Sequence, residues 1–211
     1  MSAETHDPSP AEAWRILHDG NVRFAAEDLH HPNLDWVRRH TLRSGQNPIA
    51  VVLACSDSRV PVEIIFDAGL GDVFTVRTAG EILGEEVMGS VSYAVNSLHV
   101  PLVIVLGHEG CGAVSAASKA IEGEGHIPGD HRRILVEKVA PSILKARGEG
   151  HSEPTDFERY HAVEVAKQLI ERMPKLRAKV EHGEVGILAG RYRLSDGLVE
   201  TVHSWGMSDT P

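Results

Sequence analysis

Both cysteines of this 211-residue chain stand where a short apolar run gives way to polar residues. One cysteine opens the segment CSDSR, and the other closes the segment HEGC. Thiolate and imidazole are ligands that zinc prefers, so Cys55, His108 and Cys111 could together hold one zinc ion. Three protein ligands leave a fourth tetrahedral position for water or for the carboxylate of Asp57. An exchangeable position of this kind is typical of catalytic zinc.

Two other interpretations of the cysteines stay open at this point. They could form a disulfide, although the N-terminus lacks the basic and then apolar segment of a secretory signal, and no other cysteine pair is present. Each could also be an ordinary buried thiol. The second potential ligand beside each cysteine, Asp57 in one case and His108 in the other, favours the metal site.

Length and composition predict one globular domain, because 211 residues suffice for one full core and are few for two. A formal net charge of -9 argues against nucleic acid or an anionic membrane as the main partner. No apolar run approaches the roughly 18 residues of a membrane span. We therefore expect a cytoplasmic protein with a helical arm at residues 1–45, a zinc-binding core at 46–205 and a tail at 206–211.

Alternating segments predict an α/β fold. Residues 49–54 and 101–106 are continuously apolar and rich in β-branched side chains, as buried strands of a parallel sheet are. Ser195-Asp196-Gly197 predicts a hairpin that joins two last strands, at residues 184–192 and 198–203. A further strand is expected at residues 73–76, and helices at 11–28 (with a possible break at Gly20-Asn21), 35–43, 61–70, 86–98, 111–121, 131–146 and 155–180 (interrupted at Met173-Pro174).

The predicted fold class is therefore α/β: a single domain with a mainly parallel central sheet flanked by helices, an N-terminal helical arm and a C-terminal antiparallel edge hairpin. In such sheets the functional crevice lies outside the carboxyl ends of the strands. Cys55 follows one predicted strand and His108 follows another, so segments far apart in the sequence can meet there.

The segments CSDSR, HEGC, VRTAG and SVSYAV resemble those of the β-class carbonic anhydrases, over about residues 21–121 and more weakly in the C-terminal hairpin. The resemblance implies zinc held by Cys55, His108 and Cys111, and reversible hydration of carbon dioxide to bicarbonate and a proton. It also implies a homodimer or tetramer, in which the segment around Trp14 and Phe24 packs on a neighbouring subunit.

The resemblance assigns catalytic roles to Asp57 and Arg59. Arg59 would hold Asp57 in a bidentate ion pair, and Asp57 would accept a hydrogen bond from water or hydroxide on the zinc. Freed from Arg59, Asp57 could take the fourth position on the metal and close the site. On local sequence alone, Asp57 could equally cap the following turn or the helix that begins near Pro61.

The resemblance also implies a set of substrate-binding residues. Gln46, nine residues before Cys55, corresponds to a glutamine that orients the substrate. The family's substrate pocket crosses a dimer interface, and many relatives carry Asn and a larger apolar residue where this chain has Thr78-Ala79, which predicts a roomier or differently shaped pocket. The full set expected here is Gln46, Phe74, Ala79, Gly80, Tyr93 and Gly112.

Two alternative functions stay open. The same site could hydrolyse carbonyl sulfide or carbon disulfide, which are linear triatomic electrophiles like carbon dioxide. Zinc could instead stabilise a non-catalytic protein in which Asp57 permanently fills the fourth position, although Arg59 would draw Asp57 away from the metal. Nucleotide binding is not expected, because GHEGCG lacks the lysine and hydroxyl residue of a P-loop.

Overall fold

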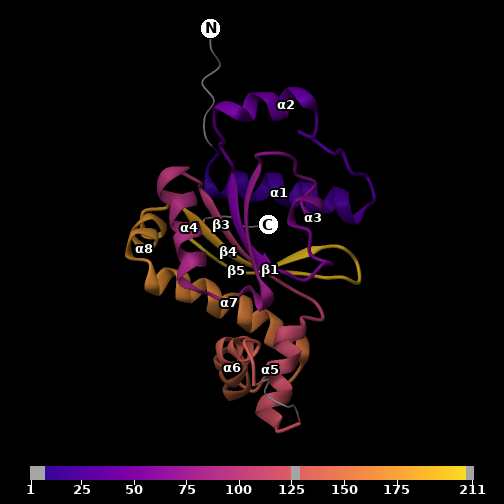
Figure 1. Ribbon diagram of the computed structural model, residues 1–211, viewed down its shortest axis with the longest axis vertical. Coiled ribbons are helices and arrows are strands. Elements are labelled where there is room, and N and C mark those ends of the chain that lie inside the picture. The colour runs from indigo at the N-terminus through magenta and orange to yellow at the C-terminus, as the bar shows by residue number, and fades with distance from the viewer. Residues whose placement is uncertain (1–7, 125–128, 208–211) are drawn as a thin grey trace.

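The computed structural model describes residues 8–124 and 129–207, and a five-stranded sheet forms the centre of this part of the chain (Figure 1). Neighbouring strands are parallel except for the last pair, which is antiparallel. The mainly parallel sheet with an antiparallel edge hairpin confirms the predicted fold class. In their order across the sheet the strands are β2 (Val73–Thr78), β1 (Ala50–Cys55), β3 (Leu102–His108), β4 (Gly186–Tyr192) and β5 (Val199–Trp205).

Helices flank the sheet on both faces, and within the described residues none is both long and apolar enough to cross a membrane. The predicted interruption at Met173-Pro174 is confirmed, because one helix ends before it and the next begins there. The helices are α1 (Pro10–Ala25), α2 (Trp36–Thr41), α3 (Val62–Ile65), α4 (Glu85–Ser97), α5 (Gly112–Glu122), α6 (Arg133–Gly148), α7 (Pro154–Arg172) and α8 (Pro174–Glu181), with short 3₁₀ turns η1 (Leu42–Ser44) and η2 (Ala79–Glu81).

Two apolar layers cover the two faces of the sheet. Successive side chains of a strand point to opposite faces, so β1 sends Val51 and Leu53 into one layer and Val52 into the other. The helices α4, α7 and α8 complete the first layer, and α1 and α3 complete the second. Every residue of β1 and β3 is buried. This two-sided burial explains why both strands are continuously apolar in sequence.

A third apolar cluster lies beyond the carboxyl ends of the strands. It joins α5, α6 and the start of α7, and it includes Cys55 and Cys111. Figure 1 shows α5 and α6 at one end of the molecule and α2 at the other. The carboxyl ends of β1 and β3 are therefore covered by a helical layer of their own.

The predicted break at Gly20-Asn21 is wrong, because α1 runs through it without interruption. A Cβ atom at residue 20 would overlap the carbonyl oxygen of Phe66, so glycine permits close packing there. The side chain of Asn21 is fully buried and donates to the carbonyls of Ile65 (3.1 Å) and Gly197 (2.8 Å). Its Oδ1 accepts from the backbone of Val199 at 2.8 Å, so it links α1 to α3 and to the hairpin.

The expectation that the segment around Trp14 and Phe24 packs on a neighbouring subunit rather than its own is wrong for these two side chains. Trp14 is fully buried and lies edge-on to Phe66 of the same chain, with ring centroids 6.3 Å apart. Phe24 contacts Tyr192 of the same chain at the same centroid distance, 6.3 Å. Further along, Trp36 and Val37 of α2 are 64% and 62% exposed, so α2 presents part of the apolar surface of the arm to solvent.

The helix α3 is shorter than predicted and ends before Asp67. Asp67 has a left-handed backbone conformation (φ 43°), which stops the helix. Its buried carboxylate accepts hydrogen bonds from the backbone amides of His30 (3.0 Å) and His31 (2.9 Å) and from Arg23 (2.7 Å). A non-local contact, rather than a local signal, therefore sets the end of this helix.

We predict that Asn21→Ala lowers the free energy of unfolding by about 2 to 3 kcal/mol, because it leaves buried backbone groups without partners. Urea denaturation measures this loss. Asn96→Ala is the matched control, since the amide of Asn96 bonds only within α4, to Ser92, and should cost far less. Equal stability of the two variants would contradict the role of Asn21.

Candidate metal centre

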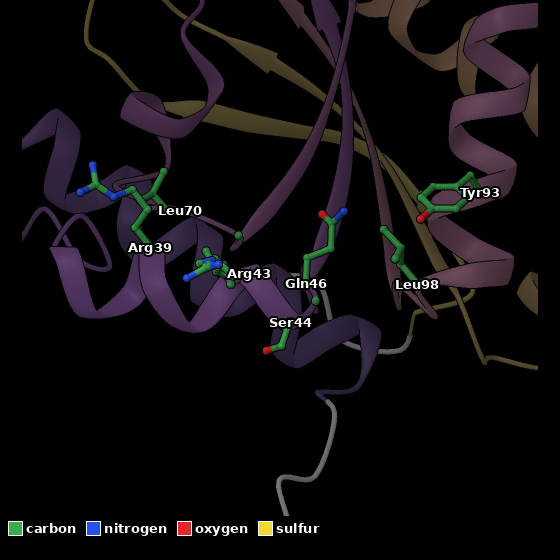
Figure 2. A pocket seen from close by; sticks show the side chains of 10 residues that line it. Arg39, Arg43, Ser44, Gln46, Leu70, Tyr93 and Leu98 are labelled. Atoms are coloured by element: carbon green, nitrogen blue, oxygen red, sulfur yellow. The ribbon is translucent and has the colours of Figure 1, made fainter.

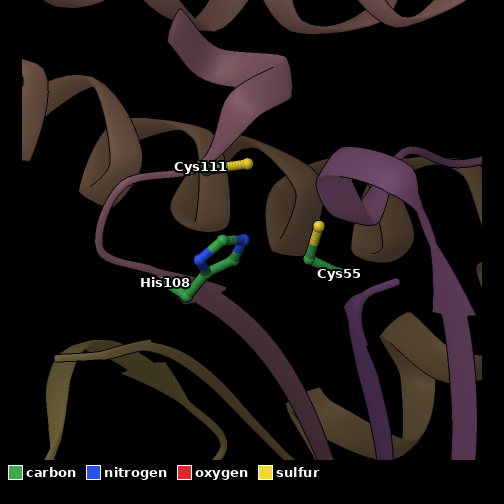
Figure 3. A group of neighbouring side chains, drawn as sticks. All are labelled: Cys55, His108 and Cys111. Carbon is green, nitrogen blue, oxygen red and sulfur yellow. The ribbon is translucent and has the colours of Figure 1, made fainter. Parts of the chain in front are cut away.

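The three predicted zinc ligands meet at the carboxyl ends of two neighbouring parallel strands (Figure 3). Cys55 is the last residue of β1, His108 is the last residue of β3, and Cys111 is the N-cap residue of α5. One ligand atom from each lies within 4.8 Å of the others. All three residues are buried. The strands extend one or two residues further than predicted, so two of the ligands belong to the strands themselves.

The tautomer of His108 suits metal binding through Nε2. Its Nδ1 lies 2.9 Å from the carbonyl oxygen of Glu109, and because a carbonyl only accepts, Nδ1 carries the proton. Nε2 then has a free lone pair, and it is buried without a hydrogen-bond partner among the described residues. Buried polar atoms are normally paired, so this nitrogen is suited to bind a metal ion. Two sulfurs and one imidazole nitrogen fit zinc.

The two thiols are free, so the disulfide interpretation is wrong. A hydrogen bond from Cys111 lowers the pKa of Cys55 to about 4. The same bond and burial raise the pKa of Cys111. Zinc binds sulfur as thiolate, so metal binding at this pair releases protons.

Asp57 and Arg59 form the predicted bidentate ion pair. The guanidinium of Arg59 donates through Nε to Oδ1 (2.9 Å) and through Nη2 to Oδ2 (2.8 Å). This pairing lowers the pKa of Asp57 well below its ordinary value and keeps the carboxylate ionised. Oδ2 lies 4.0 Å from Nε2 of His108. The carboxylate therefore stands beside the metal position while Arg59 occupies both of its oxygens.

The capping alternative for Asp57 is half right. Oδ1 accepts a hydrogen bond from the backbone amide of Arg59 at 2.9 Å, so Asp57 does cap the following turn. It does not cap α3, whose N-cap residue is Pro61. The turn and the ion pair use the same oxygen, so the local cap helps to aim the carboxylate.

Arg77 of β2 also stabilises the segment from Cys55 to Asp57, a role that was not predicted from the sequence. Its Nε donates to the carbonyl of Cys55 (3.0 Å), and its Nη2 donates to the carbonyl of Asp57 (2.6 Å). The available signal was the VRTAG segment, in which Arg77 directly follows the strand predicted at residues 73–76. The strand β2 extends to Thr78 and pairs Arg77 in register with Ala54. Arg77 holds the backbone between a metal ligand and the catalytic candidate.

Buried ionisable groups near the ligands were missed as well. Glu81 is 1% exposed, and its Oε2 has no hydrogen-bond partner among the described residues. Burial raises the pKa of Glu81 well above its usual range, which favours the neutral acid. Glu158, His161 and Arg191 are also almost fully buried. Glu158 and His161 lie on an amphipathic helix, where local sequence does not distinguish them from surface residues.

Three of the predicted substrate-binding residues lie beside the metal position. Gly80 donates its backbone N–H to the Sγ of Cys55 at 3.2 Å. Ala79 precedes it in η2, and Gly112 is the first residue of α5, next to Cys111. Gly80 has φ 67°, a left-handed conformation that favours glycine. These residues can therefore line the metal site of their own chain.

The other three lie elsewhere in the chain. Phe74 contacts Tyr93 with ring centroids 6.1 Å apart. Tyr93 and Gln46 line a surface cavity of about 640 Å³ with residues of η1 (Figure 2). Gln46 precedes β1 and Cys55 ends it, so the length of the strand alone separates them by about 16 Å. Within one chain, Gln46 and Tyr93 do not reach the metal position.

Comparison with known sequences gives matches over most of the chain. The model of the carbonic anhydrase family matches residues 50–199. Carbonic anhydrase 2 of Mycobacterium tuberculosis (strain CDC 1551 / Oshkosh) is 46% identical over 189 residues, which cover 90% of this chain and 91% of the relative. A carbonic anhydrase of Mycolicibacterium smegmatis is 46% identical over 192 residues, covering 91% of this chain and 93% of the relative.

Solved structures show a similar fold. A β-carbonic anhydrase of Aspergillus fumigatus superposes with a TM-score of 0.67 and 25% identity, covering 90% of this chain and 89% of that chain. A structure described among two tetrameric β-carbonic anhydrases of Sordaria macrospora gives a TM-score of 0.67 with 21% identity, covering 87% and 93%. At that identity the second likeness concerns the fold alone.

We predict that the purified protein carries about one zinc per chain, and that Cys111→Ser and His108→Ala each lose it, because two ligands hold zinc far more weakly than three. Elemental analysis after dialysis measures the metal content. His182→Ala is the control, since that histidine is exposed on the surface. Full zinc retention in both ligand variants would refute the assignment.

Proposed function

Because the chain belongs to the carbonic anhydrase family, in its β class, we propose that it catalyses the reversible hydration of carbon dioxide to bicarbonate and a proton, with zinc as cofactor. One observation carries this function. The carboxylate of Asp57, held by Arg59, stands 4.0 Å from the ring nitrogen of His108 that faces the other two ligands. A carboxylate beside a three-ligand zinc position suits metal-assisted hydration.

The alternatives have less support. The relatives reported above are named carbonic anhydrases, which favours carbon dioxide over carbonyl sulfide or carbon disulfide. A non-catalytic zinc protein would need Asp57 as a permanent fourth ligand. Both oxygens of Asp57 are instead engaged by Arg59.

Zinc held by Cys55, His108 and Cys111 would lower the pKa of a water molecule in its fourth position and so supply a nucleophile near neutral pH. Asp57 contributes the orientation of that water. Its Oδ1 already accepts two hydrogen bonds from Arg59, whereas Oδ2 accepts one bond from the residues described and retains a lone pair. An ionised carboxylate can only accept hydrogen bonds, so we assign Oδ2 to accept a hydrogen bond from the attacking water.

Arg59 fixes this acceptor in place. The guanidinium of Arg59 binds both oxygens of Asp57, and its Nη2 also donates to the carbonyl of Gly110 at 3.2 Å. Arg59 thereby ties the loop that follows Cys55 to the turn that precedes Cys111. The planar guanidinium suits this task, because its donors have a fixed fork geometry that an ammonium group lacks.

We further propose a homodimer at least, and that two chains share each substrate pocket. Ala79, Gly80 and Gly112 would line the metal site of their own chain. Gln46, Phe74 and Tyr93 would serve the site of the neighbouring chain. The distance between Gln46 and the metal position of its own chain, the 50% exposure of Tyr93 and the exposed apolar face of α2 support this arrangement. The relatives from Sordaria macrospora, which are described as tetrameric, are consistent with a larger assembly.

We predict that Arg59→Ala and Asp57→Ala each lower kcat/KM for carbon dioxide hydration by about 100-fold or more, because the attacking water loses its oriented acceptor. Stopped-flow measurement near neutral pH gives the rate. Zinc content should stay at the wild-type level, since neither residue belongs to the three-ligand group.

Arg132→Ala is the matched control for the dyad. Arg132 binds Asp130 through its backbone amide (2.9 Å) and its Nε (3.0 Å), in the same two-residue spacing, on the surface. Its removal should leave turnover unchanged. Near wild-type turnover of Arg59→Ala would show that Arg59 only stabilises the loop.

We predict that the double variant Trp36→Glu/Val37→Glu is monomeric and less active, because it places charge on the exposed apolar face of α2 and removes the residues of the second chain from each pocket. Light scattering gives the molar mass. Ile134→Glu is the control on α6, where Ile134 is 43% exposed. A fully active monomer would contradict the shared pocket, and an unchanged molar mass would contradict the role of α2.

A further inference from the structure

A buried polar cluster connects the metal ligands to α7 and β4. Its members come from three elements, and each is at most 5% exposed: Ser142 of α6, Glu158 and His161 of α7, and Arg191 of β4. Polar side chains buried in an apolar core are costly unless they are fully hydrogen-bonded. All four have hydrogen-bond partners. These bonds form two series, one that ends at Cys111 and one that ends at Cys55.

The carboxylate of Glu158 binds the turn that carries Cys111. Its Oε1 accepts from the backbone amide of Gly110 at 2.7 Å and from that of Cys111 at 3.4 Å. Gly110 has a left-handed conformation (φ 68°), so the turn between His108 and Cys111 is tight. A charged acceptor forms stronger hydrogen bonds with amides than a neutral acceptor does. Glu158 therefore holds the backbone of a zinc ligand directly.

Arg191 supplies the counter-charge of the buried Glu158 carboxylate. Its Nε donates to Oε2 of Glu158 at 2.7 Å, and both side chains are almost fully buried. Arg191 pairs in register with Gly107 of β3, one residue before the ligand His108. A buried charge without a counter-charge would be strongly unfavourable, so Arg191 and Glu158 act as one unit.

His161 reaches Cys55 through the peptide of Gly80. Its Nε2 lies 2.8 Å from the carbonyl oxygen of Gly80, so Nε2 carries the proton and Nδ1 accepts from the hydroxyl of Ser142 at 3.0 Å. Burial lowers the pKa of His161, which keeps the ring neutral. The amide of Gly80 in turn donates to the sulfur of Cys55 at 3.2 Å. This chain of bonds fixes the donor that faces the thiolate.

Glu158 and His161 are three residues apart on α7 and therefore lie on the same face of that helix. We infer that they are positioning residues of the metal centre. Glu158 fixes the position of Cys111 by binding the backbone amide of Cys111, and His161 fixes the position of the Cys55 sulfur through the peptide of Gly80. One face of α7 thus determines how far apart the two thiolates lie. Groups that orient metal ligands in this way commonly change metal affinity when they are removed.

The inference rests on the zinc centre of the proposed function, and it is tested by metal binding without any measurement of turnover. Glu158→Gln and His161→Leu should each bind zinc about 10-fold to 100-fold more weakly than the wild type. Competition with a chromophoric chelator measures the affinity. Cobalt(II) in place of zinc should also show shifted or weakened absorption bands, because those bands report tetrahedral geometry and thiolate ligation.

Two further variants separate positioning from stability. His161→Gln keeps an N–H donor that can reach the carbonyl of Gly80, so it should recover part of the affinity that His161→Leu loses. Val165→Ala removes packing from the same helix in the apolar layer on the sheet face. It should lower the thermal stability while leaving the zinc affinity and the cobalt spectrum unchanged.

Wild-type affinity and an unchanged cobalt spectrum in both Glu158→Gln and His161→Leu would overturn the inference, even if their thermal stability falls. If Glu158→Gln does not fold, the comparison of His161→Leu with His161→Gln decides the question by the same readouts. Absence of zinc and cobalt binding in the wild type would instead overturn the metal centre itself and the proposed function with it.

Discussion

The parallel pairing of β1 with β3 is the constraint on which the rest of the site depends. It brings the carboxyl ends of two strands, about fifty residues apart in sequence, to the same edge of the sheet, where Cys55 and His108 are their final residues. Parallel strands require both faces to be covered, and the helices on both faces meet that requirement. The apolar layers therefore do more than stabilise the fold, since their burial of both strands fixes the register that places the ligands.

The metal site also has to balance charge in a buried place. Two thiolates would neutralise Zn²⁺, so the carboxylates nearby need counter-charges of their own. Arg59 pairs with Asp57 at the more exposed side, and Arg191 pairs with Glu158 in the interior. Among the described residues Glu81 has no such partner, and burial raises its pKa well above the usual range. The two carboxylates paired with arginine thus differ in exposure, because that of Glu158 is buried and that of Asp57 is partly exposed.

The length of β1 is the reason for proposing that two chains share each substrate pocket. The group Cys55, His108 and Cys111 lies at the carboxyl end of the strand, whereas Gln46 and the cavity with Tyr93 lie near its amino end. A single chain cannot bring these ends together, because a strand is extended and stiff. A shared pocket would explain why Tyr93, which is assigned to substrate binding, is half exposed in one chain. It would also explain why α2 presents Trp36 to solvent.

Residue types and apolar runs predicted the fold class, most of the elements and the group Cys55, His108 and Cys111 that the structure brings together. The ion pair of Asp57 with Arg59 was expected from the family resemblance. The ligand chemistry of a residue depends on its own side chain, and the end of an apolar run marks the end of a strand. Candidate ligands and strand ends can therefore be predicted from local sequence. The tertiary structure alone reveals the contacts of Glu158 and His161, which bind segments 48 and 81 residues away. It also decided that Gly20-Asn21 permits packing rather than a break, and that Trp14 belongs to its own core. Such roles depend on which surfaces meet when helices pack on the sheet, and the chain order of residue types does not encode those contacts locally.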